Sequence, residues 1–167
     1  ADENQTGVDT VTASDEDGDV LTYSLSGTDE ASISINADTG AITFNSAPNY
    51  EVKNSYAVTV TVSDGQISAS QPITITILDV NDSPVMTSVA TFSANENQTG
   101  VGTVTASDED GNTLTYSLSG TDTSSLSIDS ASGVVTFVSE PDYETKMSYS
   151  VNVNINDGIN ISTASIT

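Results

Sequence analysis

The stretch Asp79-Val80-Asn81-Asp82-Ser83-Pro84 lies between two copies of one sequence and decides how the chain is divided. Its carboxylates, its carboxamide and its main-chain carbonyls are hard oxygen donors, of which Ca²⁺ takes six to eight at a time. The proline then prevents a hydrogen-bonded strand from continuing. An ordinary acidic turn explains the same six residues equally well, because loops are commonly built from Asp, Asn, Ser and Pro. The choice between a calcium-binding linker and a turn therefore depends on the rest of the chain.

The two copies are related by a shift of 93 residues, which aligns residues 1–74 with residues 94–167 without gaps and leaves about 44 of the 74 pairs identical. Segment 84–93, which precedes the second copy, has no counterpart before Ala1, and the second copy stops before a second Asp-Val-Asn-Asp. We therefore expect two domains cut from a longer array. The first spans 1–83, lacks its first strand and ends in a calcium linker at 79–84; the second spans 84–167 and lacks the end of its last strand.

Composition restricts the possible partners and chemistry. The chain has 24 Asp plus Glu, 2 Lys plus Arg and no His, which gives a formal charge of −22 and disfavours nucleic acid and anionic membranes as partners. Without Cys or His there is no disulfide, no thiolate or imidazole metal site, and no Ser-His or Cys-His nucleophile. No run approaches the roughly 18 apolar residues of a membrane span, so we expect no direct membrane insertion.

Period-2 alternation predicts β-strands, most clearly over 56–62, where Tyr56, Val58, Val60 and Val62 alternate with small or polar residues. The second copy keeps the apolar positions over 149–155. Further strands are predicted around 21–25, 33–35, 42–44, 67–69 and 73–77, and no segment shows helical periodicity. Short strands in units of about 93 residues favour an all-β fold of two tandem Greek-key β-sandwiches.

Pairs of aspartates recur at equivalent positions of the two copies. Asp15 and Asp17 lie two residues apart in a predicted turn, and Asp108 and Asp110 repeat them. Alternate residues of an extended turn can direct both carboxylates at one centre, yet two like charges about 4 Å apart repel by about 4 kcal/mol at an effective dielectric near 20. A single Asp-x-Asp is usually a solvated turn. Its repetition, together with the acidic linker, favours bound calcium.

Enzymatic alternatives fit the sequence less well. The run Asp15-Glu16-Asp17-Gly18-Asp19 faintly matches an EF-hand loop, but no predicted helices flank it and Ser26 stands where a bidentate Glu is needed. A glycosidase would need a positioned pair of carboxylates, but turns and calcium explain the carboxylates better. We therefore predict no catalytic residues and no enzymatic activity.

Taken together, these motifs resemble the cadherin repeat, in the bacterial cadherin-like form found in large secreted or surface proteins. The family's Pro-Glu-Asn corresponds to Asp2-Glu3-Asn4 and Asn95-Glu96-Asn97, and its Asp-Arg-Glu corresponds to Asn49-Tyr50-Glu51 and Asp142-Tyr143-Glu144. The repeated Asp-x-Asp and the linker Asp-x-Asn-Asp-x-x-Pro, nearly complete at 79–84, follow in the family's order. The resemblance spans nearly the whole chain. It implies that each copy is a seven-stranded, immunoglobulin-like sandwich and that the tandem is an elongated rod.

The resemblance also implies a calcium junction between the repeats, with two or three ions. Asn49 stands where the family has a carboxylate, which weakens the outermost position. The implied side-chain ligands are Glu3, Glu51, Asp79, Asn81, Asp82, Asp108, Asp110 and Asp157, and the implied main-chain oxygens belong to Val80, Ser83 and Asn112. The same mapping gives half-sites toward neighbours absent from the sequence, at Asp15, Asp17 and Asp64 and at Glu96, Asp142 and Glu144.

We therefore expect a calcium-rigidified spacer or adhesion module, extracellular or at the cell surface, whose partners are neighbouring repeats or other copies. A carbohydrate-binding module of a secreted polysaccharide-degrading protein is the alternative. An exposed aromatic face would favour it, but Tyr23, Tyr56 and Phe44 fall on apolar faces. A third possibility is a surface filament, in which the strand at 85–93 of one copy completes the first repeat of another.

Overall fold

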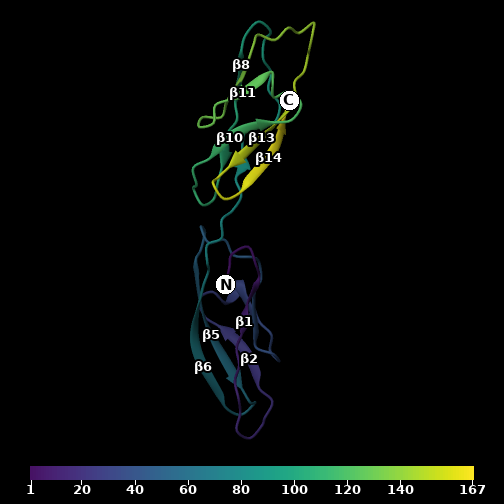
Figure 1. The fold of residues 1–167 in the computed structure, drawn as a ribbon. Helices are drawn as coiled ribbons and strands as arrows, with labels where there is room; N and C mark the ends of the chain where they lie inside the picture. Colours follow the sequence, from purple (N-terminus) through teal and green to yellow (C-terminus); the bar gives the residue numbers. More distant parts are fainter. The chain divides into compact units, whose positions relative to one another are not determined.

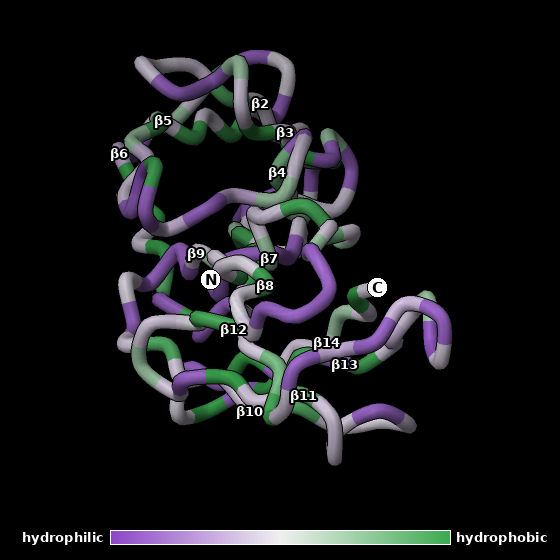
Figure 2. The backbone as a smooth tube through the Cα atoms, turned by 90° about the horizontal axis from the view of Figure 1, so that it is seen from above, coloured by the Kyte–Doolittle hydropathy of each residue, from purple (hydrophilic) through white to green (hydrophobic).

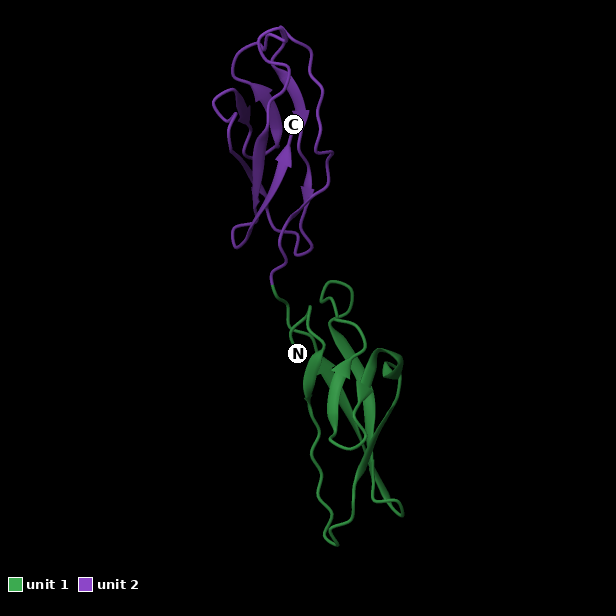
Figure 3. Ribbon diagram, turned by 90° about the vertical axis from the view of Figure 1, so that its right-hand side faces the viewer, with its two compact units in different colours: residues 1–80 green, residues 81–167 purple.

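The computed structural model describes all 167 residues, Ala1–Thr167, and divides into two compact units, Ala1–Val80 and Asn81–Thr167 (Figure 3). Strands and loops make up nearly all of both units (Figure 1), apart from a 3₁₀ turn, η1, at Glu30–Ser32. The prediction of an all-β fold is therefore confirmed. No helix has the length and apolar character needed to cross a bilayer.

The first unit consists of two three-stranded antiparallel sheets, with strand orders β1-β4-β3 and β2-β5-β6. Consecutive strands change sheets between β1 and β2 and between β2 and β3, as expected of a sandwich with crossover connections. The strands are β1 (Gly7–Thr10), β2 (Thr22–Ser26), β3 (Ile33–Ile35), β4 (Ala41–Phe44), β5 (Ser55–Ser63) and β6 (Ser68–Thr76).

The second unit repeats both sheets, as β8-β12-β11 and β10-β13-β14, and adds the two-stranded sheet β7-β9. Four of its strands lie at the positions of β1, β2, β3 and β4 shifted by 93 residues. The strands are β7 (Val85–Met86), β8 (Gly100–Thr103), β9 (Ala106–Ser107), β10 (Thr115–Ser119), β11 (Leu126–Ile128), β12 (Val134–Phe137), β13 (Val151–Asn156) and β14 (Ile161–Ile166).

The core of each unit lies between its sheets and is built from the alternating side chains of its strands. On β5, Val58 and Val60 are 3% exposed, and on β13 Val153 and Ile155 are fully buried. The hydrophobic stretches in Figure 2 accordingly fall on strands such as β5 and β12, whereas many of the loops are hydrophilic. The alternation that predicted the strands therefore also predicts the buried face.

One predicted boundary was wrong: the runs at 67–69 and 73–77 form the single strand β6, Ser68–Thr76. Pro72 lies inside this strand, between the two predicted runs. It is tolerated because β6 is an edge strand that pairs only with β5, where Pro72 lies opposite Thr59. An edge strand can lack one amide donor without leaving a neighbouring strand unpaired.

A tight turn recurs in both units where a glycine contacts the backbone of another segment. Gly40 has φ +72°, and a Cβ there would lie 2.3 Å from the carbonyl oxygen of Val11. Gly133, with φ +70°, makes the same approach to Val104, at 2.2 Å. Only glycine fits both the conformation and the space. This turn fixes the segment after β1 against the start of β4, and its counterpart after β8 against the start of β12, within the same sheet.

Candidate functional site

Glu3 is the most buried acidic residue of the first unit, with 1% of its surface exposed. Its Oε1 accepts a hydrogen bond from the Val80 amide and its Oε2 accepts one from the Tyr50 amide, both at 2.8 Å. The Glu3 amide itself donates to the Leu78 carbonyl at 3.1 Å. The carboxylate thus joins the start of the unit, the loop at 50 and the last residue of the unit.

Two further carboxylates lie beside Glu3. Glu3, Glu51 and Asp79 each place one oxygen within 4.8 Å of the others. Like charges this close repel, and a carboxylate buried without a cation is costly. Backbone amides satisfy part of the Glu3 charge, but an oxygen-binding cation would compensate all three. The donor set fits Ca²⁺, which prefers carboxylate and carbonyl oxygens.

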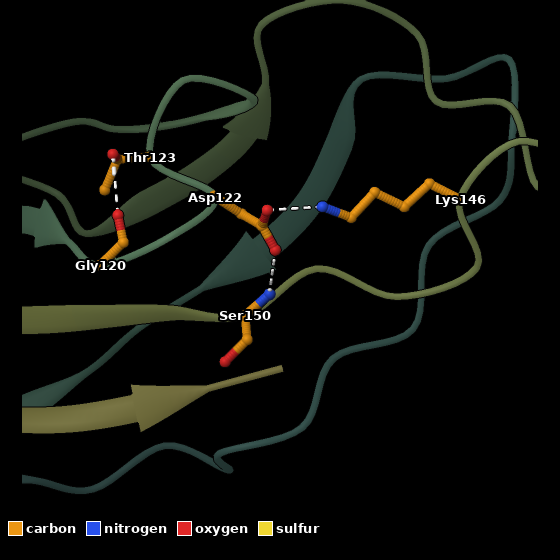
Figure 4. Close-up of polar contacts among 5 residues, drawn as sticks. All are labelled: Gly120, Asp122, Thr123, Lys146 and Ser150. Atoms are coloured by element: carbon orange, nitrogen blue, oxygen red, sulfur yellow. Dashed lines mark hydrogen bonds and ion pairs between the residues drawn. The ribbon is translucent and has the colours of Figure 1, made fainter.

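The lysines do not supply that compensation, because each pairs with an aspartate outside the cluster. In the second unit Lys146 Nζ lies 2.5 Å from Asp122 Oδ1, and Asp122 Oδ2 accepts a hydrogen bond from the Ser150 amide at 2.8 Å (Figure 4). Lys146 also lies 4.7 Å from the ring centre of Tyr149. The hydrogen bond from Lys146 and that from Ser150 hold the pKa of Asp122 below its usual range.

The same arrangement holds in the first unit, where Lys53 pairs with Asp29 and lies 4.7 Å from the ring centre of Tyr56, and the Ala57 amide donates to Asp29. The pKa of Asp29 is lowered, first by Lys53 and then by Ala57. Both lysines of the chain are therefore engaged in matching local ion pairs.

In the second unit the residues that follow Val80 are held by carboxylates of two loops. The Asp82 amide donates to Asp110 Oδ2 at 2.7 Å, and Asn81 Nδ2 donates to Asp157 Oδ2 at 3.0 Å. Asn112 Nδ2 donates to Asn81 Oδ1 at 3.0 Å. One polar cluster is thus formed by residues that are distant in sequence. They lie in the linker and in the loops after β9 and β13.

Asp157 is 7% exposed and ends the buried face of β13. Its Oδ1 accepts hydrogen bonds from the amides of Ile159 and Asn160, at 2.6 and 2.5 Å. The pKa of Asp157 is lowered, first by the Asn81 side chain and then by these amides, despite the opposing effect of burial. The carboxylate is therefore held in its charged form.

Asp108 provides the clearest sign that the cluster is built for a cation. Its Oδ1 accepts a hydrogen bond from the Asn112 amide at 3.1 Å, whereas its Oδ2 is buried and has no hydrogen-bond partner. A buried acceptor without a partner costs about 1–3 kcal/mol, and more when it is charged. A cation coordinated by Oδ2 would remove this cost, so the residues present fit a calcium ion.

The predicted side-chain ligands thus fall into one cluster in each unit: Glu3, Glu51 and Asp79 in the first, and Asn81, Asp82, Asp108, Asp110 and Asp157 in the second. The roles of all of them, and of the oxygens of Val80, Ser83 and Asn112, stay predictions. Asn160 was missed: its Nδ2 lies 3.5 Å from the Asn81 carbonyl oxygen. The repeat gave no signal for it, because its counterpart in the first copy is Ile67.

The predicted half-site of the first unit consists of local turns. Asp15 Oδ1 accepts hydrogen bonds from the amides of Asp17 and Asp19, at 2.9 and 3.2 Å. Asp64 Oδ1 accepts bonds from the amides of Gln66 and Ile67, and these lower its pKa, with Ile67 making the larger contribution. These carboxylates stabilise the turns in which they lie.

The predicted half-site of the second unit is an exposed copy of the Glu3 cluster. Glu96, Asp142 and Glu144 each place one oxygen within 4.8 Å of the others, and all three are exposed. Glu96 Oε2 accepts a hydrogen bond from the Tyr143 amide at 3.2 Å. A hydrogen bond from the Thr145 hydroxyl is the main cause of the lowered pKa of Asp142.

Comparison with known proteins identifies relatives of both units. The cadherin domain family matches residues 1–78 and 88–167. Human Cadherin-23 is 34% identical over 155 residues, which are 87% of this chain and 5% of that protein. Chitinase A of Pseudoalteromonas piscicida is 38% identical over 109 residues, 64% of this chain and 13% of that protein. The chain thus spans a small part of the curated relatives that it matches.

Solved structures agree with this assignment. The structure of mouse Cadherin-23 EC22-24 matches with a TM-score of 0.55 and 28% identity, over 88% of this chain and 50% of that one. Human Protocadherin-24 EC1-2 (Form II) matches in fold, with a TM-score of 0.61 and 24% identity, over 95% of this chain and 82% of that one. Cadherin domains are extracellular, non-enzymatic modules of adhesion proteins. The chain belongs to the cadherin domain family, as two tandem repeats.

Proposed function

We propose that these two repeats form a calcium-stiffened extracellular module that sets the orientation of consecutive repeats in an adhesion or structural protein. The observation that supports the proposal most directly is the buried Oδ2 of Asp108, a carboxylate oxygen without a hydrogen-bond partner. The nearly inaccessible carboxylate of Glu3 supports it from the other unit. Neither residue is paired with a lysine, since both lysines pair with other aspartates.

The chain connects the two ligand clusters directly. The first cluster ends at Asp79 and the Val80 amide, and the second begins at Asn81 and Asp82. Calcium ions that take ligands from both clusters would couple the units through this peptide. Without calcium the carboxylates repel and many orientations are populated. With calcium, the orientation that offers most ligands is favoured by its higher affinity for the ion.

We propose two or three ions, with the outermost position weakened by Asn49. The half-sites at Asp15, Asp17 and Asp64 and at Glu96, Asp142 and Glu144 would bind weakly by themselves. Extracellular calcium modules bind with dissociation constants of roughly 10⁻⁴ to 10⁻³ M. Such affinities keep the sites filled only in a calcium-rich medium, which agrees with a secreted or cell-surface protein whose partners are neighbouring repeats or other copies.

A calcium titration followed by small-angle X-ray scattering tests the proposal. We expect the radius of gyration to change saturably between chelator and a few millimolar calcium, and the spread of interdomain distances to narrow. Magnesium at equal concentration is the control, since it demands near-ideal octahedral geometry and retains several waters. Identical scattering curves with chelator and with calcium would refute the stiffening role.

Binding to polysaccharide is a second candidate, and the similarity to Chitinase A is the observation that favours it. The arrangement of aromatic residues gives it little further support, because most pack in the two cores, while Tyr143 is 57% exposed. Cosedimentation with insoluble chitin tests it, with Tyr143→Ala as the matched variant. Equal sedimentation with and without chitin would exclude this candidate.

A further inference from the structure

The sheet β10-β13-β14 of the second unit (Figure 1) contains no charged residue. The acidic residues of this unit all lie in turns and loops, although the chain as a whole carries a formal charge of −22. The field of such a chain repels anionic polymers, and a cationic ligand would be attracted to the carboxylates of the loops instead. A ligand of the outer face of this sheet should therefore be uncharged.

Three asparagines, Asn152, Asn154 and Asn156, form a row on the outer side of β13, the middle strand of this sheet. Their direction follows from the alternation of the strand, because Val153 and Ile155 between them are fully buried. Alternate residues of a strand lie about 6.8 Å apart. The face thus presents carboxamide groups at a regular spacing along one line, which we call the asparagine row.

Neighbouring groups fix the carboxamides at the two ends of the row. Ser165 Oγ donates to Asn152 Oδ1 at 2.8 Å, and the Gly158 amide donates to Asn156 Oδ1 at 2.7 Å. The Nδ2 groups of Asn152 and Asn156 donate no hydrogen bond within the protein. Side chains that are already held lose less conformational entropy when they bind a ligand. The row therefore offers two preorganised N–H donors.

The middle of the row is satisfied internally. Asn154 Oδ1 accepts a hydrogen bond from Thr163 Oγ1 at 3.0 Å, and Asn154 Nδ2 donates to Ser119 Oγ at 3.1 Å. Asn154 thus connects β10 to β14 across the face. The hydroxyls of Thr115 and Ser117 on β10 are exposed on the same side. A hydroxyl can donate or accept, so these groups complement the two fixed donors.

An exposed apolar side chain lies beside one of the free donors. Ile161 on β14 is directly opposite Asn156 and is 64% exposed. Directly opposite residues of an antiparallel pair point to the same face, with Cβ atoms about 4.5–5.5 Å apart. An amide donor next to an exposed apolar group matches an acetamido group, which presents a carbonyl oxygen and a methyl group.

We propose that the asparagine row binds a neutral polysaccharide that carries acetamido groups. The carbonyl oxygens of these groups accept hydrogen bonds from Asn152 Nδ2 and Asn156 Nδ2, and one methyl group contacts Ile161. This inference rests on the second candidate function, binding to polysaccharide, and gives that function a site. A second copy of the chain fits the face less well, because two chains that each carry a charge of −22 repel one another.

The first unit lacks this arrangement, although its strands correspond. Thr59, Thr61 and Ser63 of β5 stand at the positions of the three asparagines. The Thr61 hydroxyl is hydrogen-bonded to the Ser70 hydroxyl at 2.8 Å, and the Ser63 hydroxyl donates to the Ile67 carbonyl at 3.1 Å. The outer side of β5 therefore has no carboxamide donors and provides an internal control.

The test is a titration of the full 167-residue chain with chitohexaose, followed by the chemical shifts of side-chain and main-chain amides. We expect saturable shifts of the Asn152 and Asn156 side-chain amides and none on β5. Cellohexaose has hydroxyl groups in place of the acetamido groups and should bind about tenfold more weakly, since it lacks two amide acceptors. Equal affinity for the two sugars, or shifts confined to other surfaces, would overturn the proposal.

A matched variant exchanges the row for the residues of the first unit. The triple change Asn152→Thr, Asn154→Thr and Asn156→Ser introduces side chains with which the corresponding strand of the first unit already folds. It should lower the affinity for chitohexaose about tenfold. The reverse change, Thr59→Asn, Thr61→Asn and Ser63→Asn, keeps the row and should leave the shifts at Asn152 and Asn156 unaltered.

Cosedimentation with insoluble chitin separates failure of the site from failure of the function. If the triple variant sediments with chitin as well as the original chain does, polysaccharide binding stands and the proposed site is wrong. If the original chain binds neither chitin nor chitohexaose, the candidate function itself fails. Sedimentation of the original chain without chitin, lost in the triple variant, would show that the face binds a second copy and would overturn the proposal.

Discussion

The two repeats have much the same sequence, but some residues that are buried in one repeat are exposed at the equivalent position of the other. Glu3 is 1% exposed and accepts two backbone hydrogen bonds, whereas Glu96, at the same position of the second repeat, is exposed. The Glu3 side of the first unit is covered by Ile77, itself 1% exposed, and by residues up to Val80. In the second unit β14 ends at Ile166, the counterpart of Ile73, and an open groove of about 290 Å³ lies beside its core.

At the other end the relation is reversed. Val104 is fully buried beneath segment 84–92, while Val11 lines an open groove. The residues that cover Glu3 and Val104 lie on the two sides of the Val80–Asn81 boundary. In these two repeats, the segments beside the boundary supply part of the core and part of the acidic clusters.

The largest effect should come from calcium, which would use the carboxylates at the boundary. Free calcium at about 100 times the dissociation constant adds about 2.7 kcal/mol to the free energy of unfolding for each independent site. We expect thermal unfolding followed by calorimetry to shift upward between chelator and millimolar calcium, more than with magnesium. An unchanged melting curve would mean that the boundary clusters do not bind the ion.

The next largest effect is a difference in stability cost between the buried position of the second unit and its half-buried counterpart in the first. Val104→Ala removes two fully buried carbon atoms and should cost about 2 kcal/mol, whereas the same change at Val11 should cost less than about 1 kcal/mol. Urea unfolding followed by residue-resolved NMR reports the two units separately. An equal decrease in the free energy of unfolding in the two variants would show that segment 84–92 does not determine the burial of this position.

A third experiment compares the aspartate pairs. Asp110→Ala removes the acceptor of the Asp82 amide and a proposed ligand, so we expect calcium affinity to fall at least tenfold, or about 1.4 kcal/mol. Asp15→Ala, at the position of Asp108 in the other repeat, should change it much less. Titration calorimetry measures both. A similar loss of calcium affinity in the two variants would contradict a calcium site at the boundary.

The smallest effect should be the same in the two repeats. Lys146→Met removes the main cause of the lowered pKa of Asp122, so that pKa should rise, and Lys53→Met should do the same for Asp29. A lowered carboxyl pKa contributes stability above the ordinary aspartate value, and this is lost as the pH falls through the lowered value. Both variants should therefore lose less stability on acidification.

Carboxyl carbon shifts followed through a pH titration measure these pKa values directly. Asp64 is the internal control, because backbone amides and not a lysine lower its pKa. A rise of the aspartate pKa in only one of the two repeats would show that the two matching ion pairs are not equivalent.

The two-repeat organisation, the all-β class and most inward-facing positions were predictable from the sequence alone. These follow from local signals: the 93-residue repeat, the alternation on strands such as β5, and the turn glycines. The acidic positions of the candidate clusters were also predictable, because family motifs are read from short runs. The single strand β6 was not, since tolerance of Pro72 depends on its place at a sheet edge.

Which of two identical residues is buried could not be predicted from the sequence, because it depends on the packing of the folded chain. Glu3 and Glu96 occupy the same motif, as do Val11 and Val104, and no local pattern distinguishes the members of either pair. Their burial depends on segments distant in sequence, such as residues 77–80 and 84–92, that pack over one copy and not the other. The unpartnered oxygen of Asp108 likewise appears only when separate loops converge, because hydrogen bonding and burial are properties of the folded chain.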